Sequence, residues 1–151
     1  MPIYLDTSAL AKLYHREIGS ARLEELLSES GAVFLSRLGV LEMHSVLSGK
    51  VRTNVVTRAD SELTGRRFRS DVRRRLFRVV ALHVRHYELA QSLIDNHGAS
   101  RGLKTLDSLQ LAVALDLKRS GLIDCFVTAD KVLVDVAPLE DLKCIDPEVA
   151  A

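Results

Sequence analysis

Four carboxylates hold comparable places in the sequence, each near the point where a short apolar run gives way to a helical pattern. Asp6 ends the first apolar run, and Asp130 follows a later one. Glu42 lies one to two turns into a predicted helix, and Asp107 falls in the first turn of another. Because parallel strands and the helices that follow them share one edge of a sheet, we expect the four side chains to converge at that edge.

Each carboxylate taken alone also has an ordinary structural explanation. An aspartate near a helix N-terminus caps the helix and complements its dipole, worth about 0.3–1 kcal/mol at exposed sites, which suits Asp107 and Asp130. Glu42 has apolar or small helical neighbours, so it either reaches solvent from the edge of a buried face or needs a partner inside. Together, however, four uncompensated carboxylates repel one another, and a positive charge should lie among them.

The residues around these acids indicate whether a basic side chain or a metal ion supplies the positive charge. No lysine or arginine flanks Asp6 closely, and none of the five histidines has a clear metal-ligand spacing. An all-oxygen set suits a hard divalent cation, Mg²⁺ or Mn²⁺. Such a cation acidifies water toward a hydroxide nucleophile and stabilises charge on a scissile phosphate. The sequence therefore predicts metal-dependent phosphoryl transfer with an activated water as the nucleophile.

The elements that must position these side chains follow from the apolar pattern. Short apolar runs predict strands, and amphipathic stretches between them predict helices. The strands are expected near 3–5, 32–35, 78–82, 123–127 and perhaps 142–145. The helices are expected from Ala9 (capped by Thr7 and Ser8), over 18–30, from Ser36 to Gly49, over 55–77 with a break near Gly65, over 83–97 with Gly98 as the stop, over 106–119 after a Thr105 cap, and as a turn up to Val136.

This alternation predicts an α/β fold: a three-layer α/β/α domain with a mainly parallel central sheet of four to five strands. The chain has 151 residues, of which 47% are hydrophobic, enough for one sizeable core, so we expect a single domain over 1–151. Cys125 and Cys144 lie in apolar runs without metal-ligand spacing. No leader or membrane-spanning run is apparent, which predicts a cytoplasmic protein without a membrane partner.

Four segments, in order, make this sequence similar to the PIN-domain ribonucleases, and especially to the compact VapC-type toxins of type II toxin–antitoxin pairs. They are Ile-Tyr-Leu-Asp6-Thr-Ser-Ala-Leu, Leu41-Glu42, Leu103-Lys-Thr-Leu-Asp107-Ser-Leu-Gln-Leu-Ala and Phe126-Val-Thr-Ala-Asp130. The resemblance runs from Ile3 to about Ile145. Each segment alone is a weak signal, whereas all four at fitting intervals are a strong one.

The resemblance implies roles for the matching residues. The acidic quartet of the family, catalytic and metal-binding, corresponds to Asp6, Glu42, Asp107 and Asp130, with Asp6 and Asp107 foremost as direct metal ligands. Hydroxyl side chains beside the first and last acids are expected to support them: Thr7, Ser8 and Thr128.

One position departs from the family pattern. Many relatives have histidine after the third acid, where this chain has Gln110. Because this is not a ligand position, we expect the difference to affect substrate preference more than catalysis.

The resemblance also implies a function and partners. It implies an endoribonuclease that cleaves single-stranded or loop RNA with Mg²⁺ or Mn²⁺, forms a homodimer and is inhibited by a cognate antitoxin. The alternative is a PIN-like RNA- or partner-binding module without significant nuclease activity. A haloacid-dehalogenase-type phosphatase is disfavoured because it needs a second aspartate where this chain has Ser8, and a receiver domain because the third apolar run closes without an acid.

A basic segment contrasts with the acids. The formal net charge is only +1, yet residues 51–78 contain nine arginines and three acids. A solvated helix face and a docking surface for an acidic antitoxin tail are alternatives to RNA binding here. The absence of tryptophan gives little sign of a base-stacking platform. The candidate RNA-binding residues in the segment are Arg66, Arg67, Arg69, Arg73 and Arg74.

Overall fold

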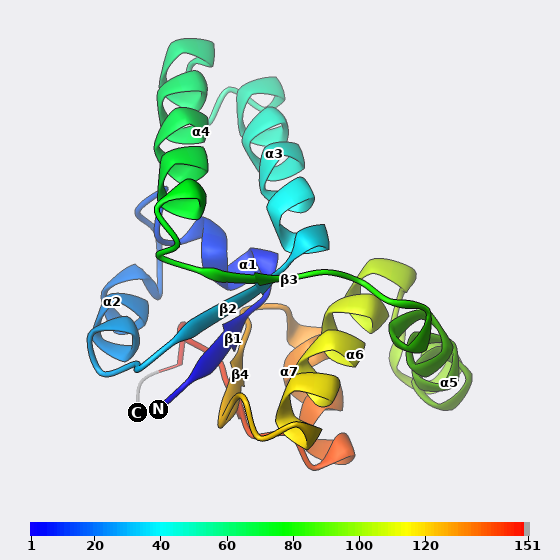
Figure 1. The fold of residues 1–151 in the computed structure, drawn as a ribbon. Helices are drawn as coiled ribbons and strands as arrows, with labels where there is room; N and C mark the ends of the chain where they lie inside the picture. Colours follow the sequence, from blue (N-terminus) through cyan, green and yellow to red (C-terminus); the bar gives the residue numbers. More distant parts are fainter. Residues whose placement is uncertain (150–151) are drawn as a thin grey trace.

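The computed structural model describes residues 1–149 as one twisted sheet with helices on both faces (Figure 1). The strands are β1 (Ile3–Leu5), β2 (Val33–Ser36), β3 (Arg78–Val80), β4 (Cys125–Val127) and β5 (Cys144–Ile145). The helices are α1 (Thr7–Ala11), α2 (Ser20–Ser28), α3 (Arg37–Arg52), α4 (Arg58–Arg73), α5 (Val84–Arg101), α6 (Thr105–Arg119) and α7 (Lys131–Val136), followed by a 3₁₀ helix, η1 (Ala137–Glu140).

The sheet has the strand order β3-β2-β1-β4-β5, and every neighbouring pair is parallel. The N-terminal strand is therefore central: Ile3 pairs with Val33 on one side and with Cys125 on the other. All five predicted strands are present, and the predicted mainly parallel sheet is wholly parallel. Since consecutive strands run the same way, their carboxyl ends lie along one edge, from which the helices depart.

Two apolar cores lie on opposite faces of the sheet, because successive side chains of a strand point to opposite sides. Tyr4 and Phe126 pack with α5, α6 and α7, whereas Ile3, Leu5 and Cys125 pack with α1 to α4. These strand residues are almost fully buried. The three layers predicted from the sequence are thereby confirmed.

Several predicted helix boundaries are wrong, two of them at glycines. The helix was expected to break near Gly65, but α4 runs unbroken through it, because Gly65 is a buried contact between α4 and α3. Its missing Cβ would lie 3.7 Å from Leu47. Gly98 was expected to end the next helix, yet α5 continues to Arg101, and Gly102 ends it in the left-handed conformation with a φ of 74°.

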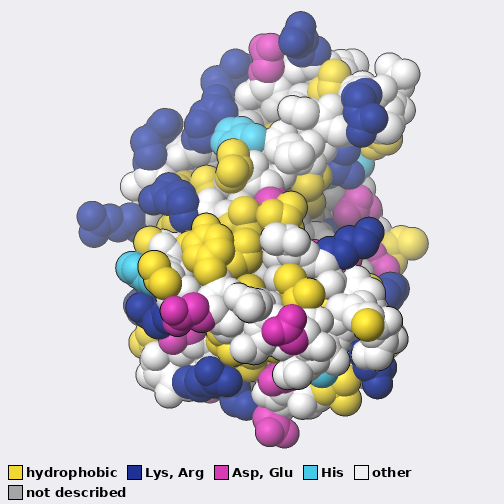
Figure 2. Space-filling view, turned by 90° about the vertical axis from the view of Figure 1, so that its right-hand side faces the viewer, with side chains coloured by type: hydrophobic (Ala, Val, Ile, Leu, Met, Phe, Trp, Pro, Cys, Tyr) yellow, Lys and Arg dark blue, Asp and Glu magenta, His cyan; other side chains and the backbone are white. Residues whose placement is uncertain are grey.

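Some apolar side chains remain uncovered. Figure 2 shows hydrophobic side chains gathered on one side of the molecule. Leu41 of α3 and Tyr87 of α5, which are 67% and 57% exposed, line one hollow, and Val84 at the start of α5 is 74% exposed. Within residues 1–149, none of the helices combines the length and the apolar character that crossing a membrane requires.

Candidate functional site

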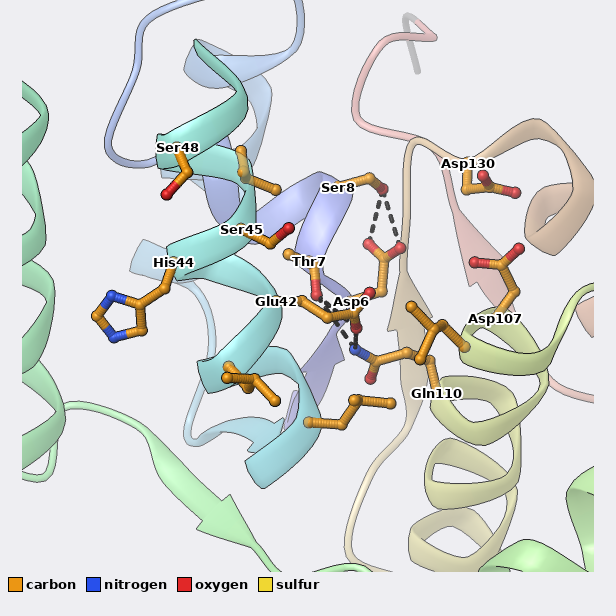
Figure 3. Close-up of a pocket in the computed structure, with 14 residues that line it drawn as sticks. Asp6, Thr7, Ser8, Glu42, His44, Ser45, Ser48, Asp107, Gln110 and Asp130 are labelled. Carbon is orange, nitrogen blue, oxygen red and sulfur yellow. Dashed lines mark hydrogen bonds between the residues drawn. The ribbon is translucent and has the colours of Figure 1, made fainter. Parts of the chain in front are cut away.

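A pocket of 630 Å³ opens at the carboxyl edge of the sheet, between α1, α3, α6 and the start of α7 (Figure 3). All four predicted acids line it: Asp6 from the end of β1, Glu42 from α3, Asp107 from the first turn of α6, and Asp130 from the loop after β4. Among residues 1–149, neither a lysine nor an arginine lines this pocket. The sheet thus brings together side chains that are far apart in the sequence.

Asp6 is the most buried of the four acids, at 5% exposed. It caps α1, since its Oδ1 accepts the Ala9 N–H at 3.0 Å, and the Ser8 hydroxyl donates to its Oδ1 at 2.8 Å. The predicted cap was Thr7 and Ser8 with a helix from Ala9, whereas the helix begins at Thr7 because Asp6 supplies the cap. Burial raises the pKa of Asp6 to about 6, although these hydrogen bonds favour the ionised form.

Asp130 and Thr128 are held in a similar way on the neighbouring strand. Asp130 caps α7 by accepting the Leu133 N–H at 3.0 Å. Thr128 is fully buried, and its Oγ1 accepts the Asp130 N–H at 3.0 Å and lies 3.3 Å from the Ser8 hydroxyl. Ser8 Oγ also accepts the Ala129 N–H at 2.9 Å. These hydroxyls therefore join the loops that carry Asp6 and Asp130.

Asp107 shows the electrostatic consequence of the crowding. Its pKa is raised to about 6, first by partial burial and then by the negative charges of Asp130 and Glu42. Lys104 opposes this shift from outside the pocket lining. Asp107 is therefore ionised at neutral pH only at a cost, which a nearby cation would relieve.

The Glu42 carboxylate is hydrogen-bonded within the protein and does not simply reach solvent from the edge of a buried face. The Thr7 hydroxyl donates to its Oε1 at 3.1 Å, and the Gln110 amide nitrogen donates to the same oxygen at 2.7 Å. Gln110 is 3% exposed, so its side chain contacts an acid of the pocket rather than solvent. The sequence indicates a role for Gln110 in substrate preference and gives no sign of this hydrogen bond between α6 and α3.

Three further polar residues of α3, which are not among the site residues predicted from the sequence, also line the pocket: His44, Ser45 and Ser48. Ser45 and Ser48 follow Glu42 at intervals of three residues, which places them on the same side of the helix. Two small hydroxyl residues on an otherwise apolar face were the signal in the sequence that could have identified them.

The four carboxylates do not form a preassembled cation site. Across residues 1–149, no three histidine, cysteine, aspartate or glutamate side chains are grouped closely enough to hold one metal ion. The repulsion that raises the pKa of Asp107 opposes a closer grouping of these charges.

The candidate arginines lie along α4 and at its C-terminal end, outside the lining of the acidic pocket. They have different surroundings. Arg66 and Arg69 line a cleft that shares His44 and Ser48 with the acidic pocket. Arg67 instead stacks over the Tyr14 ring, with its guanidinium carbon 5.6 Å from the ring centre. The remaining two lie toward the end of α4: Arg73 lines a hollow with Val40 and Phe68, and Arg74 is the exposed residue that ends the helix.

Comparison with known proteins identifies the class to which this fold and site belong. Residues 3–139 match the PIN domain family, and the chain is a member of that family. The search of curated proteins gave no match.

Solved structures with the same fold include three that align over most of both chains. FitAcB from Neisseria gonorrhoeae has 16% identity and a TM-score of 0.69, covering 96% of this chain and 97% of its own. VapC20 from Mycobacterium tuberculosis, described as a sarcin-ricin loop cleaving toxin, has 18% identity and a TM-score of 0.65, with 88% and 93% covered. A toxin–antitoxin complex from Klebsiella pneumoniae has 17% identity and a TM-score of 0.63, with 96% and 97% covered.

The raised pKa of Asp6 predicts a stability effect that depends on pH. Because its folded pKa of about 6 exceeds the ordinary 3.8, ionisation of Asp6 destabilises the folded state as pH rises through 6. Asn keeps the cap without the charge. Asp6→Asn should therefore increase the free energy of unfolding by on the order of 1 kcal/mol at pH 7.5 with EDTA present, and this gain should vanish as pH falls toward 4. Denaturant titrations at several pH values measure it.

The matched control for this measurement is Asp95→Asn, since Asp95 is an exposed aspartate of α5. It should leave the unfolding free energy nearly unchanged. A stability loss in Asp6→Asn at pH 7.5, or a gain that persists at pH 4, would contradict the account of Asp6 as a buried charge.

Proposed function

We propose that this chain is a Mg²⁺- or Mn²⁺-dependent endoribonuclease that hydrolyses RNA phosphodiester bonds in the cytoplasm, as the toxin of a toxin–antitoxin pair. The observation that carries the proposal is the lining of the pocket, in which four carboxylates meet without a lysine or arginine. Membership of the PIN domain family supports it.

The residues present suit a hard divalent cation. The donor set is entirely oxygen, and the negative charges of Asp130 and Glu42 contribute to the raised pKa of Asp107. Asp6 and Asp107 would be the principal ligands, with Glu42 and Asp130 completing the set. Such a cation, when bound, lowers the pKa of water and stabilises negative charge on phosphate oxygens.

The chain's own contribution is the fixed placement of the acids. Backbone N–H groups hold Asp6 and Asp130 at helix N-termini, and the Ser8 hydroxyl links the two loops. The pocket is open on one side, so an extended strand can enter it past the exposed side chains of Leu41 and Leu106. This arrangement suits an extended or looped-out nucleic acid better than a buried small molecule.

We expect RNA cleavage that requires metal and the buried acid. Purified protein incubated with a mixed structured RNA pool should cut it with Mg²⁺ or Mn²⁺ and not with EDTA. Asp6→Asn and Asp107→Asn should lose cleavage by 100-fold or more, on the order expected for disabling metal-dependent chemistry, and should remain folded because they remove a crowded charge. Gel analysis of the products measures the rates.

Asp95→Asn serves as the control for this assay, since Asp95 lies outside the acidic pocket. Equal cutting by wild type and Asp6→Asn would reveal a contaminating nuclease. Binding of RNA without cutting under any metal condition would favour the alternative, a PIN-like RNA-binding module.

We further propose that Arg66 and Arg69 bind the RNA backbone beside the acidic pocket, because the cleft they line shares His44 and Ser48 with that pocket. Removing both charges should weaken RNA binding and reduce the slope of log affinity against log salt by about 2, since each phosphate contact releases a counterion. Fluorescence anisotropy at several salt concentrations, in the cleavage-deficient Asp6→Asn background, measures the slope.

Arg119→Ala is the matched control, because Arg119 is exposed at the far end of α6, away from the pocket. An unchanged slope in the double variant would leave the segment as a solvated helix face or as a docking surface for an acidic antitoxin tail.

We propose a cognate antitoxin and a second copy of this chain as its protein partners. The Klebsiella pneumoniae relative is itself a toxin–antitoxin complex. For the homodimer, the support comes from an apolar hollow on the face shown in Figure 2, lined by Leu38, Leu41, Leu82 and Tyr87. Exposed apolar surface of this kind is usual at interfaces.

Sedimentation velocity tests the homodimer. The wild-type chain should sediment as a dimer at micromolar concentration, and Tyr87→Glu should shift it to monomer because it places a charge in the apolar contact. Ile18→Glu, at a residue that is 75% exposed just before α2 and outside the lining of this hollow, should remain dimeric. A monomeric wild type, or equal behaviour of the two variants, would contradict a homodimer through this face.

A further inference from the structure

One buried amide at the inner wall of the acidic pocket joins four elements of the fold. Gln110, on α6, contacts Tyr4 of β1, Ser36 at the end of β2, Thr7 of α1 and Glu42 of α3. No buried side-chain nitrogen or oxygen atom of residues 1–149 lacks a hydrogen-bond partner. A fully satisfied buried network of this kind holds its members in one arrangement.

The hydroxyl groups on one side of Gln110 fix which way its amide faces. Ser36 Oγ accepts the Gly39 N–H at 2.8 Å, so its own proton is available to donate to Gln110 Oε1 at 3.1 Å. The Tyr4 hydroxyl donates to the same oxygen. With two donors on Oε1, the amide nitrogen must point toward Glu42.

Two atoms then surround one oxygen of Glu42 and also contact each other. Gln110 Nε2 lies 2.7 Å from Glu42 Oε1 and 3.2 Å from Thr7 Oγ1, which itself lies 3.1 Å from Glu42 Oε1. Oε2 of Glu42 has no hydrogen-bond partner among residues 1–149. Because no buried oxygen there is unpaired, Oε2 reaches the open pocket that Glu42 lines.

The backbone of α3 leaves room for this contact at Gly39, which precedes Glu42 by three residues. A Cβ on Gly39 would lie 3.3 Å from Gln110 Nε2, 3.4 Å from Ser36 Oγ and 3.7 Å from Thr7 Oγ1. The first distance is tighter than most real contacts of a Cβ atom, so the amide would have to move. The absence of a side chain at Gly39 therefore leaves the space in which Gln110 can hydrogen-bond to Glu42.

We infer that Gln110 is a positioning residue: it holds one carboxylate oxygen of Glu42 and thereby presents the other oxygen to a divalent cation in the pocket, with Gly39 providing the space. This inference rests on the proposed function for the identity of the ligand. The inferred role of Gln110 is to increase the affinity for the cation. The resemblance in sequence had instead implied an effect on substrate preference.

Mn²⁺ binding, followed by electron paramagnetic resonance of the free ion, tests this role without using activity. Gln110→Met removes the amide with little change in side-chain length, and it should weaken Mn²⁺ affinity about tenfold, as expected for losing an outer hydrogen bond to a ligand. The same substitution in the Glu42→Gln background should cause no further loss. A purely structural defect would weaken Mn²⁺ binding in both backgrounds.

Gly39→Ala is the second variant, because it disturbs the same contact without removing a buried polar group. It should also weaken Mn²⁺ binding, though less than Gln110→Met does. Gly49→Ala is its matched control, since Gly49 is in the same helix and a Cβ there meets nothing within 4 Å. It should bind Mn²⁺ like the wild type, and circular dichroism should show every variant folded at the assay temperature.

The outcomes separate this inference from the proposed function. If Gln110→Met binds Mn²⁺ as tightly as the wild type, the inference is overturned even though the wild type cuts RNA. If the variant weakens Mn²⁺ binding only when Glu42 is present and the wild type cuts no RNA, the positioning role stands and the proposed function fails. A wild type that binds no Mn²⁺ overturns the inference whatever the cleavage assay gives.

Discussion

The electrostatic repulsion among four carboxylates is the constraint to which the rest of the pocket responds. Parallel strands deliver Asp6 and Asp130 to the same edge of the sheet, and α3 and α6 add Glu42 and Asp107. The negative charges of Asp130 and Glu42, together with partial burial, raise the pKa of Asp107 to about 6. Without a lysine or arginine in the lining, the protein holds this charge in place by other means.

Those means are neutral hydrogen-bond donors. Helix N-termini supply backbone N–H groups to Asp6 and Asp130, and the Ser8 hydroxyl joins the loops on which they stand. Glu42 receives a hydroxyl and an amide instead. Donors of this type orient a carboxylate without neutralising it, so the negative charge remains available to an external cation. A buried arginine in place of these donors would have neutralised the carboxylates, and no negative charge would have remained to bind a cation.

The parts of the structure that depend on periodicity and connectivity could be predicted from the sequence. Strand positions, the parallel sheet and the meeting of the acids at one edge follow from short apolar runs separated by amphipathic helices. What the sequence does not reveal depends on three-dimensional packing. Gly65 does not break α4, because it lies against Leu47, and the position of Arg67 over the Tyr14 ring depends on how α4 docks. The role of Gln110 could not be predicted, since its four partners come from four elements.

The central position of the first strand has a consequence for the order in which the chain can fold. β1 pairs on one side with β2 and on the other with β4, which is near the end of the sequence. During synthesis, one side of β1 lacks its partner until most of the chain has left the ribosome, and pairing across such a separation is slow. Asp130 belongs to that late segment, so a truncated or still nascent chain lacks part of the acidic pocket. Only a chain that extends past Asp130 contains the whole set of acids.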